Sequence, residues 1–249
     1  MEINIIGIKG IPEVEPGDDL ANLIIDSIQR QGIKIMNKDV IVVTHKIVSK
    51  AEGRLVDLKK INPSDFALKI SKRRKKDPRM VEVILREAKR IVRMERGVII
   101  AETRHGFVCA NAGVDKSNVR GENMVSLLPI DPDKSAKSIR DEIKRRLNTD
   151  VAVIISDTFG RPWREGQTNI AIGVSGLEPI LDYRGKKDSY GYILKVTAIA
   201  IADELASAAE LAMGKLRMVP IAIIRGYRYI EGEGSIRSLI RPRSKDLFR

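Results

Sequence analysis

The sequence of 249 residues contains only one cysteine, Cys109, and two histidines, His45 and His105. A single cysteine excludes an internal disulfide, and three such ligands scattered along the chain argue against a structural zinc site. We therefore expect any bound metal ion to have oxygen ligands, which favours Mg²⁺ or Mn²⁺.

Aromatic residues make up only 4% of the chain and are not interleaved with the basic residues. This argues against a surface on which single-stranded nucleic acid stacks. No stretch reaches the roughly 18 apolar residues that cross a membrane. The N-terminal sequence lacks the charged, apolar and small-residue regions of a signal peptide. These absences favour a cytoplasmic protein without a membrane partner.

Positive charge is what the chain has in excess, with 45 lysines and arginines against 33 acidic residues and a formal net charge of +12. Such a balance favours anionic partners, either nucleic acid, acidic lipid or small polyanionic substrates. The densest basic run, Lys72–Lys76, is typical of a nucleic-acid patch or of an ordinary solvated surface. A thermophile surface rich in Lys, Arg and Glu would explain part of the charge without any function.

The apolar pattern predicts a mixed α+β fold, with mixed sheets, packed helices and two closely associated lobes in a single unit of residues 1–249. Short apolar runs predict strands at 2–9, 40–44, 97–101, 107–111, 151–155 and 219–224. Amphipathic patterns predict helices at 20–31, over most of 62–96, at 135–147 and at 192–213. In the second of these, a helix that begins at residues 77–78 is expected to continue to Val92.

Residues 151–174 are the segment around which we expect the chain to be organised. The buried strand at 151–155 leads into three oxygen-bearing side chains at 156–158, then a loop that contains Arg161 and Arg164. The carboxyl ends of strands in open α/β sheets are where ligands bind. An acid for a hard cation and two guanidinium groups suit phosphate and carboxylate chemistry. The alternative is that Asp157 only caps a turn.

A second acid, Asp115, lies just beyond the strand expected at 107–111, with the amide of Asn118 three residues later. Asp115 and Asp157 would be able to share one divalent cation if their strands are neighbours, which the sequence does not reveal. Lys46 and Lys50 follow the strand at 40–44 with helical spacing, so a helix would turn both toward one side. They would bind phosphates as point charges, or form a solvated helix face.

Known nucleotide-binding fingerprints are missing. Met213-Gly214-Lys215 is similar to the end of a P-loop, but Ala209 stands where the first glycine belongs and Leu216 where a Ser or Thr should hold Mg²⁺. If the chain binds a nucleotide, it does so without a Walker motif or a dinucleotide-binding glycine motif.

Six segments, taken together, resemble the coenzyme F420-0:γ-glutamyl ligase family. They are Ile8–Glu13, Val48–Gly53, Ala112–Asn118, Ser156–Gly166, Glu210–Lys215 and Asp246–Arg249. The match runs in order from the first expected strand to the last residue, and several collinear motifs are far more specific than one. The length also fits the stand-alone archaeal form of the family.

The resemblance implies a reaction in which GTP and a divalent metal ion join L-glutamate to the terminal carboxylate of coenzyme F420-0, a phospholactyl deazaflavin. Further glutamates would be γ-linked, and the implied intermediate is an acyl phosphate whose formation releases GDP. The resemblance also suggests a homodimer with interlocked subunits and leaves a role for K⁺ open.

The same resemblance implies three groups of site residues. The expected ligands of Mg²⁺ or Mn²⁺ are Asp115, Asp157 and Thr158. The residues expected to line the nucleotide are Ile11, Pro12, Glu13, Thr44, His45, Lys46, Lys50, Asn118, Met213, Gly214 and Lys215. Arg161 and Arg164 are expected to be catalytic, bound to the anionic acceptor or the transferring phosphoryl group.

Two other functions stay open. A nucleic-acid-binding protein would explain the net charge and Lys72–Lys76 but not the acids beyond the strands. A different metal-dependent small-molecule phosphotransferase would share the metal and nucleotide site but leave a stable phosphorylated product.

Overall fold

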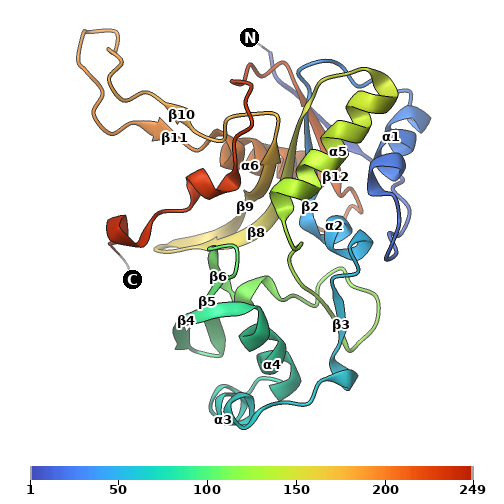
Figure 1. Cartoon of the computed structure of the whole chain (residues 1–249), viewed down its shortest axis with the longest axis vertical. Helices are drawn as coiled ribbons and strands as arrows, with labels where there is room; N and C mark the ends of the chain where they lie inside the picture. Colours follow the sequence, from blue (N-terminus) through green and yellow to red (C-terminus); the bar gives the residue numbers. More distant parts are fainter. Residues whose placement is uncertain (1, 248–249) are drawn as a thin grey trace.

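A mixed five-stranded sheet forms the centre of the computed structural model, which describes residues 2–247 (Figure 1). Across the sheet the strands are β1 (Asn4–Ile8), β12 (Ile221–Arg225), β2 (Val40–Thr44), β8 (Ala152–Arg161) and β9 (Arg164–Ser175). β2 and β8 run parallel, and every other neighbouring pair is antiparallel. The parallel pair matters for function because both of its strands end at the same edge of the sheet.

Helices cover both faces of this sheet. α5 (Pro132–Leu147) packs on β8 and β9 with α1 (Leu20–Arg30) beside it, whereas α6 (Ile201–Met213) packs on β9, β12 and β1. Figure 1 shows α5 in front of the sheet and α6 behind it. Successive strand residues point to opposite faces, and the consecutive residues 40–43, 151–155 and 221–224 are all buried. The unbroken apolar runs of these strands therefore reflect a sheet that is covered twice.

Local sequence signals fix the helix ends. The Asp19 carboxylate caps α1 by accepting from the Asn22 backbone, and Asp131 caps α5 in the same way, with Pro132 at the first helical position. Asn148 ends α5 in the left-handed conformation. These caps explain why the helices expected at 20–31 and 135–147 form almost where the sequence predicts them.

A second lobe is inserted between α2 (His45–Ala51) and α5. It has its own buried core, which includes Leu58, Ile84 and Val125. Its elements are β3 (Leu55–Asp57), α3 (Asp65–Arg74), α4 (Pro78–Glu87), β4 (Ala88–Glu95), β5 (Val98–Thr103), β6 (Val108–Ala110) and β7 (Met124–Ser126). We call residues 55–127 the inserted lobe and the rest the sheet lobe; Figure 1 shows the inserted lobe below the sheet. The mixed α+β fold with two lobes is thus confirmed.

One predicted helix is wrong in its second half. α4 ends at Glu87, and residues 88–95, expected to continue it to Val92, instead form β4, which pairs antiparallel with β5. The segment carries Ile91, Val92 and Met94, and β-branched residues suit a strand. Pairing with β5 gives the backbone its hydrogen bonds there, so tertiary contacts decided between two acceptable local structures.

Two further expectations need correction. The expected loop at 160–166 is part of a hairpin: β8 continues to Arg161 and pairs with β9 from Ser156↔Ala171 to Arg161↔Arg164, leaving only Pro162 and Trp163 as the turn. The helix expected at 192–213 begins only at Ile201. Residues 183–197 form an extended arm, closed at its base by pairing of β10 (Leu181–Asp182) with β11 (Ala198–Ile199).

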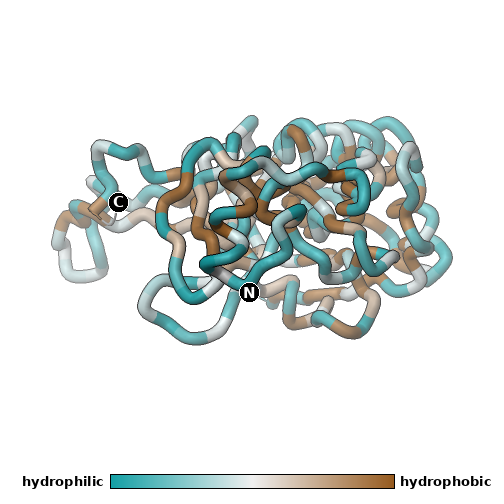
Figure 2. The backbone as a smooth tube through the Cα atoms, turned by 90° about the horizontal axis from the view of Figure 1, so that it is seen from below, coloured by the Kyte–Doolittle hydropathy of each residue, from teal (hydrophilic) through white to brown (hydrophobic). Residues whose placement is uncertain are grey.

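Hydropathy along the backbone follows the two cores. Figure 2 shows hydrophobic segments running through the interior and mainly hydrophilic ones at the periphery. Among residues 2–247, no helix has the length and apolar character needed to cross a membrane. The C-terminal motif Asp246–Arg249 lies partly outside the described residues, because Phe248 and Arg249 are not among them.

Candidate active site

A pocket of about 1010 Å³ opens between the two lobes at the edge where β2 and β8 end. It is lined by all three predicted metal ligands, Asp115, Asp157 and Thr158. It is also lined by most of the residues predicted for the nucleotide, namely Ile11, Pro12, Glu13, Thr44, His45, Lys46, Lys50, Asn118, Gly214 and Lys215. Segments that are more than 100 residues apart in the sequence therefore meet in one cavity.

The parallel register of β2 and β8 brings the first pair of site residues together. Thr44 lies opposite Ser156 in this register, so His45, the first residue of α2, lies beside Asp157, which stays in β8 and pairs with Ile170 of β9. His45 Nδ1 lies 3.1 Å from Asp157 Oδ1. Burial alone would raise the pKa of Asp157, but the charge and hydrogen bond of His45, with the Thr158 backbone N–H, hold that pKa below its ordinary value.

The second acid, Asp115, belongs to the inserted lobe. Asp115 is fixed by two backbone hydrogen bonds with Ser126, and Lys46 Nζ lies 2.8 Å from Asp115 Oδ2. The same ammonium donates to Ser126 Oγ at 2.6 Å. Burial would raise the pKa of Asp115, but the Lys46 charge and hydrogen bonds from Lys46 and Ser117 lower it to about 2. Asp115 is therefore ionised at any physiological pH.

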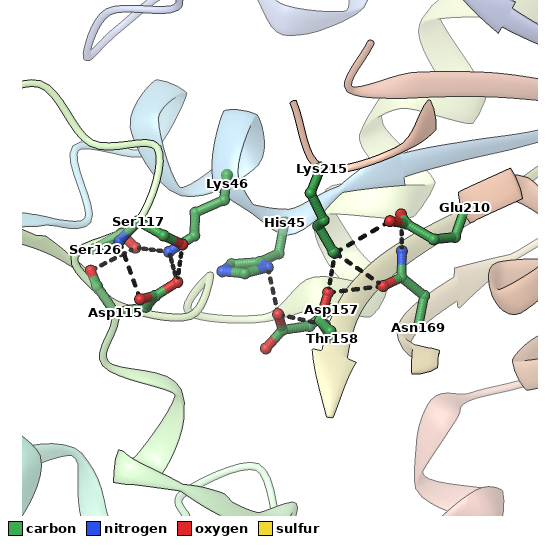
Figure 3. A network of polar contacts seen from close by, with 10 residues as sticks. All are labelled: His45, Lys46, Asp115, Ser117, Ser126, Asp157, Thr158, Asn169, Glu210 and Lys215. Carbon is green, nitrogen blue, oxygen red and sulfur yellow. Dashed lines mark hydrogen bonds and ion pairs between the residues drawn. The ribbon is translucent and has the colours of Figure 1, made fainter. Parts of the chain in front are cut away.

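Consecutive residues of α2 serve the two acids. In Figure 3 the side chains of His45 and Lys46 turn toward Asp157 and Asp115, respectively. One helical turn further on, Lys50 Nζ lies 2.5 Å from Glu13 Oε1, in the loop after β1. The spacing of Lys46 and Lys50 thus places both ammonium groups on the pocket side of α2, as the functional interpretation of this pair required.

Thr158 of β8 and Asn169 of β9 begin a third set of polar contacts in the pocket. Thr158 is paired with Asn169 in the hairpin register, and Thr158 Oγ1 donates to Asn169 Oδ1 at 2.7 Å. Asn169 Nδ2 donates to Glu210 Oε2 of α6 at 2.9 Å. Lys215 donates to Thr158 Oγ1 and lies 3.4 Å from Glu210 Oε1. Sequence reasoning missed Asn169 as a site residue, although it opens the apolar segment at 169–174.

The acids that line the pocket are thus each matched by a basic side chain of the protein itself. Glu13, Asp115, Asp157 and Glu210 pair with Lys50, Lys46, His45 and Lys215. A pocket with this many fixed charges of both signs suits a ligand that brings both, such as a polyphosphate with its metal ion.

The oxygen ligands of the pocket suit a hard metal ion in kind, but they are too few to complete its coordination. Asp115, Asp157 and Thr158 supply oxygen atoms, and both carboxylates have lowered pKa values, so they are available as anionic ligands. Within residues 2–247, no group of three or more His, Cys, Asp or Glu side chains is arranged to hold an ion by itself. Part of the coordination would therefore come from phosphate oxygens or water, as is usual for Mg²⁺.

Three predicted residues lie outside the pocket lining. Met213 is 1% exposed and packs in the core of the sheet lobe, so its side chain belongs to the core rather than to the pocket lining. Arg161 and Arg164 flank the exposed turn of the β8–β9 hairpin, where Arg161 Nη2 donates to the Glu165 carbonyl at 2.7 Å. Gly160, directly before them, is the nearest residue of this strand in the lining.

Neither the single cysteine, Cys109, nor the second histidine, His105, is placed for chemistry in the pocket. Cys109 lines the pocket, but burial and the nearby charge of Asp157 raise the pKa of its thiol to about 12. His105 Nε2 lies 2.9 Å from the Pro129 carbonyl oxygen, in a turn outside the pocket.

The sequence of the chain, compared with known proteins, places it in a family of ligases. The family model described as F420-0:Gamma-glutamyl ligase matches residues 7–226, and the chain belongs to this family.

Three of these relatives are named coenzyme F420:L-glutamate ligase. The one from Methanothermobacter thermautotrophicus is 48% identical over 252 residues, which cover 100% of both chains. The one from Methanopyrus kandleri is 48% identical over 95% of this chain and 94% of its own. The one from Methanocaldococcus jannaschii is 49% identical over 86% of each chain. Family membership makes this chain a ligase and confirms the resemblance seen in the sequence.

Proposed function

We propose that this chain joins L-glutamate to the terminal carboxylate of coenzyme F420-0 in a GTP-dependent reaction and then adds further, γ-linked glutamate. The names of its relatives support the acceptor and the amino acid. The observation that carries the proposal is the pocket in which Lys46, Lys50 and Lys215 meet Asp115 and Asp157.

The chemistry requires activation of a carboxylate, which is a poor acylating agent. An oxygen of the coenzyme carboxylate takes the γ-phosphoryl group of GTP, the bond between that phosphorus and the bridging oxygen breaks, and GDP leaves. The glutamate amine then attacks the acyl carbon, the C–N bond forms, the C–O bond to phosphate breaks and the amine loses a proton to solvent or base. Phosphoryl transfer depends chiefly on alignment and charge neutralisation.

The residues of the pocket suit those two needs. Lys46 and Lys50 project from one side of α2 and would neutralise phosphate oxygens as point charges. Asp115, Asp157 and Thr158 would hold Mg²⁺ or Mn²⁺, which supplies positive charge to the nucleotide phosphates when bound. Because Asp115 belongs to the inserted lobe and Asp157 to the sheet lobe, both lobes would grip the nucleotide.

Other parts of the proposal extend beyond the pocket. Arg161 and Arg164, at the hairpin turn, would bind the anionic coenzyme or the transferring phosphoryl group. A homodimer and a cytoplasmic location belong to the same proposal, which treats the partners as small molecules rather than nucleic acid. The net charge of +12 then reflects three anionic substrates.

The test is a mass spectrum of the coenzyme after incubation with the protein, GTP, Mn²⁺ and L-glutamate. We expect a product heavier by one glutamyl residue, later by several, with GDP and orthophosphate released in equal amounts and only when both coenzyme and glutamate are present. Parallel reactions replace GTP with ATP and omit the metal. A stable phosphorylated coenzyme formed without glutamate would instead identify a phosphotransferase, and no change in the coenzyme would reject both.

A further inference from the structure

The ammonium group of Lys215 lies among oxygen atoms contributed by three other elements (Figure 3). It donates to Thr158 Oγ1 of β8, lies 3.3 Å from Asn169 Oδ1 of β9 and lies 3.4 Å from Glu210 Oε1 of α6. A hydroxyl, an amide oxygen and a carboxylate are oxygen ligands of the kind that hard cations bind in proteins. All four residues line the pocket.

The oxygen atoms are held in place independently of the lysine. Asn169 is 2% exposed, and its Nδ2 donates to Glu210 Oε2 at 2.9 Å, which turns Oδ1 toward the cation. Thr158 and Asn169 face each other in the hairpin register and share a 2.7 Å hydrogen bond. The Ser207 hydroxyl donates to the Asn169 backbone carbonyl at 2.6 Å. This arrangement is a preformed site rather than a chance contact of one flexible side chain.

The chain approaches the site through a backbone position that suits glycine. Gly214 ends α6 with a φ of 62°, a left-handed conformation that other residues adopt at a cost. The next residue, Lys215, therefore starts close to the carboxyl end of α6, where the helix dipole also favours a positive charge. The backbone turn at Gly214 and the dipole of α6 together favour placing the Lys215 ammonium group beside the oxygen atoms of Thr158, Asn169 and Glu210.

We propose that Lys215 is a tethered cation, whose ammonium group occupies an oxygen-lined cation site within the pocket. The same oxygen atoms would bind a free metal ion if the side chain were shortened. The positive charge at this position of the pocket is thus part of the protein itself, and no metal ion from solution is needed to supply it. The inference rests on the proposed metal-dependent site, with which it shares Thr158, but concerns the position around Glu210 and Asn169 rather than the one around Asp115.

A competing role for Lys215 makes a different prediction. If this side chain were an ordinary phosphate-binding lysine with an accidental contact to Thr158, its removal would weaken nucleotide binding but create no affinity for ions. If it only complemented the end of α6, removal would lower stability slightly and again create no ion site. Ion binding in the absence of substrates therefore separates the tethered cation from both alternatives.

The experiment measures Mn²⁺ binding to the full chain without nucleotide, coenzyme or glutamate, by the loss of the electron paramagnetic resonance signal of free Mn²⁺. We expect K215A to bind one more Mn²⁺ per chain than the wild type. The matched control is K137A, because Lys137 is as exposed as Lys215 (55% against 54%) and is also paired with one carboxylate, but on the surface of α5. K137A should bind the same number of ions as the wild type.

Two further measurements guard against a false result. The double variant K215A/T158V should lose the additional ion, because the valine removes one oxygen without changing the size of the side chain much. A site that prefers K⁺ would show itself as a melting temperature of K215A that rises with K⁺ while that of the wild type does not. If K215A gains neither a Mn²⁺ ion nor a K⁺-dependent melting temperature, the proposal is wrong. Because no substrate is used, this result is independent of whether the chain ligates glutamate.

Discussion

The Nζ atom of Lys46 lies 2.8 Å from Oδ2 of Asp115, and this ion pair joins the sheet lobe to the inserted lobe. The neighbouring residue of α2, His45, pairs with Asp157 within the sheet lobe. A single short helix therefore organises both acids of the pocket. The predictions below test these contacts, the electrostatics of the site and the packing behind it.

Asp115 and Asp157 should each be required for turnover. We expect D115N and D157N to lower the rate of coenzyme glutamylation by about 10²-fold or more, the scale seen when a group that stabilises transition-state charge is removed. D141N is the control, since Asp141 is an exposed acid of α5 that pairs with Lys137 outside the pocket. Rates are measured with saturating substrates on protein verified as folded. Near-normal turnover of either pocket variant would refute the proposed metal ligands.

The low pKa of Asp115 predicts a pH-dependent contribution to stability. Because that pKa is about 2 in the folded protein, below its ordinary value of 3.8, the ionised carboxylate stabilises the fold above about pH 4. The stabilisation is lost as the pH falls through about 2. The difference in unfolding free energy between the wild type and D115N should therefore shrink over this interval. Urea unfolding at several pH values measures it, and a constant difference would contradict the assignment.

The thiol of Cys109 should be inert in the folded protein. Its pKa is raised to about 12 by burial and by the charge of Asp157, so almost no thiolate exists at neutral pH. We expect a thiol reagent such as DTNB, at pH 8, to react with the native chain at least about 10²-fold more slowly than with the urea-unfolded chain. Since the sequence has one cysteine, the absorbance reports this site alone. Equal rates would show that the thiol is accessible.

Arg161 and Arg164 provide a test of the hairpin turn. If they bind the anionic coenzyme or the transferring phosphoryl group, R161A and R164A should lower kcat/KM for the coenzyme, and lysine at either position should recover part of the loss. R145A is a suitable control, because Arg145 is exposed on α5 and pairs with Glu142. Unchanged kinetics in both alanine variants would remove these residues from the proposed site.

Gly173 should be necessary for the close approach of β9 and α5. A Cβ atom at this position would lie 2.4 Å from the Pro132 carbonyl carbon and oxygen, so G173A must push the helix away. We expect a loss of about 1–3 kcal/mol in unfolding free energy, typical of overpacking. G160A is the control for stability, since a Cβ there meets nothing within 4 Å. Chemical denaturation of both variants makes the comparison, and equal stabilities would contradict this packing.

Much of the fold was predictable because its signals are local. The apolar runs at 40–43 and 151–155 became the parallel pair β2 and β8, and Asp19 and Asp131 cap their helices by bonds to residues only three positions away. The prediction failed at 88–95, where the same residues suit a helix or a strand. There, pairing with β5 decided the outcome, and no single-sequence pattern reports which partner a strand will find.

The candidate site shows the same division. The motifs pointed to Asp115, Asp157, Lys46 and Lys50, and all four line one pocket. Their partners were not predictable, because each ion pair joins residues from different elements. Asn169 and Glu210 gained significance only when the hairpin register and the packing of α6 placed their oxygen atoms around Lys215.

The sequence by itself determined the chemical character of this protein: its oxygen ligands, its lysines at helical spacing, its buried strands and the motifs of its family. These features depend on residue type and on neighbours a few positions away, where propensity and periodicity act. Only the tertiary structure decided which charges meet. The parallel register of β2 and β8 and the packing of the inserted lobe against the sheet lobe bring these charged side chains together. Charges attract each other strongly only at short distance, and residues far apart in the sequence give no sign of whether they will be close in space.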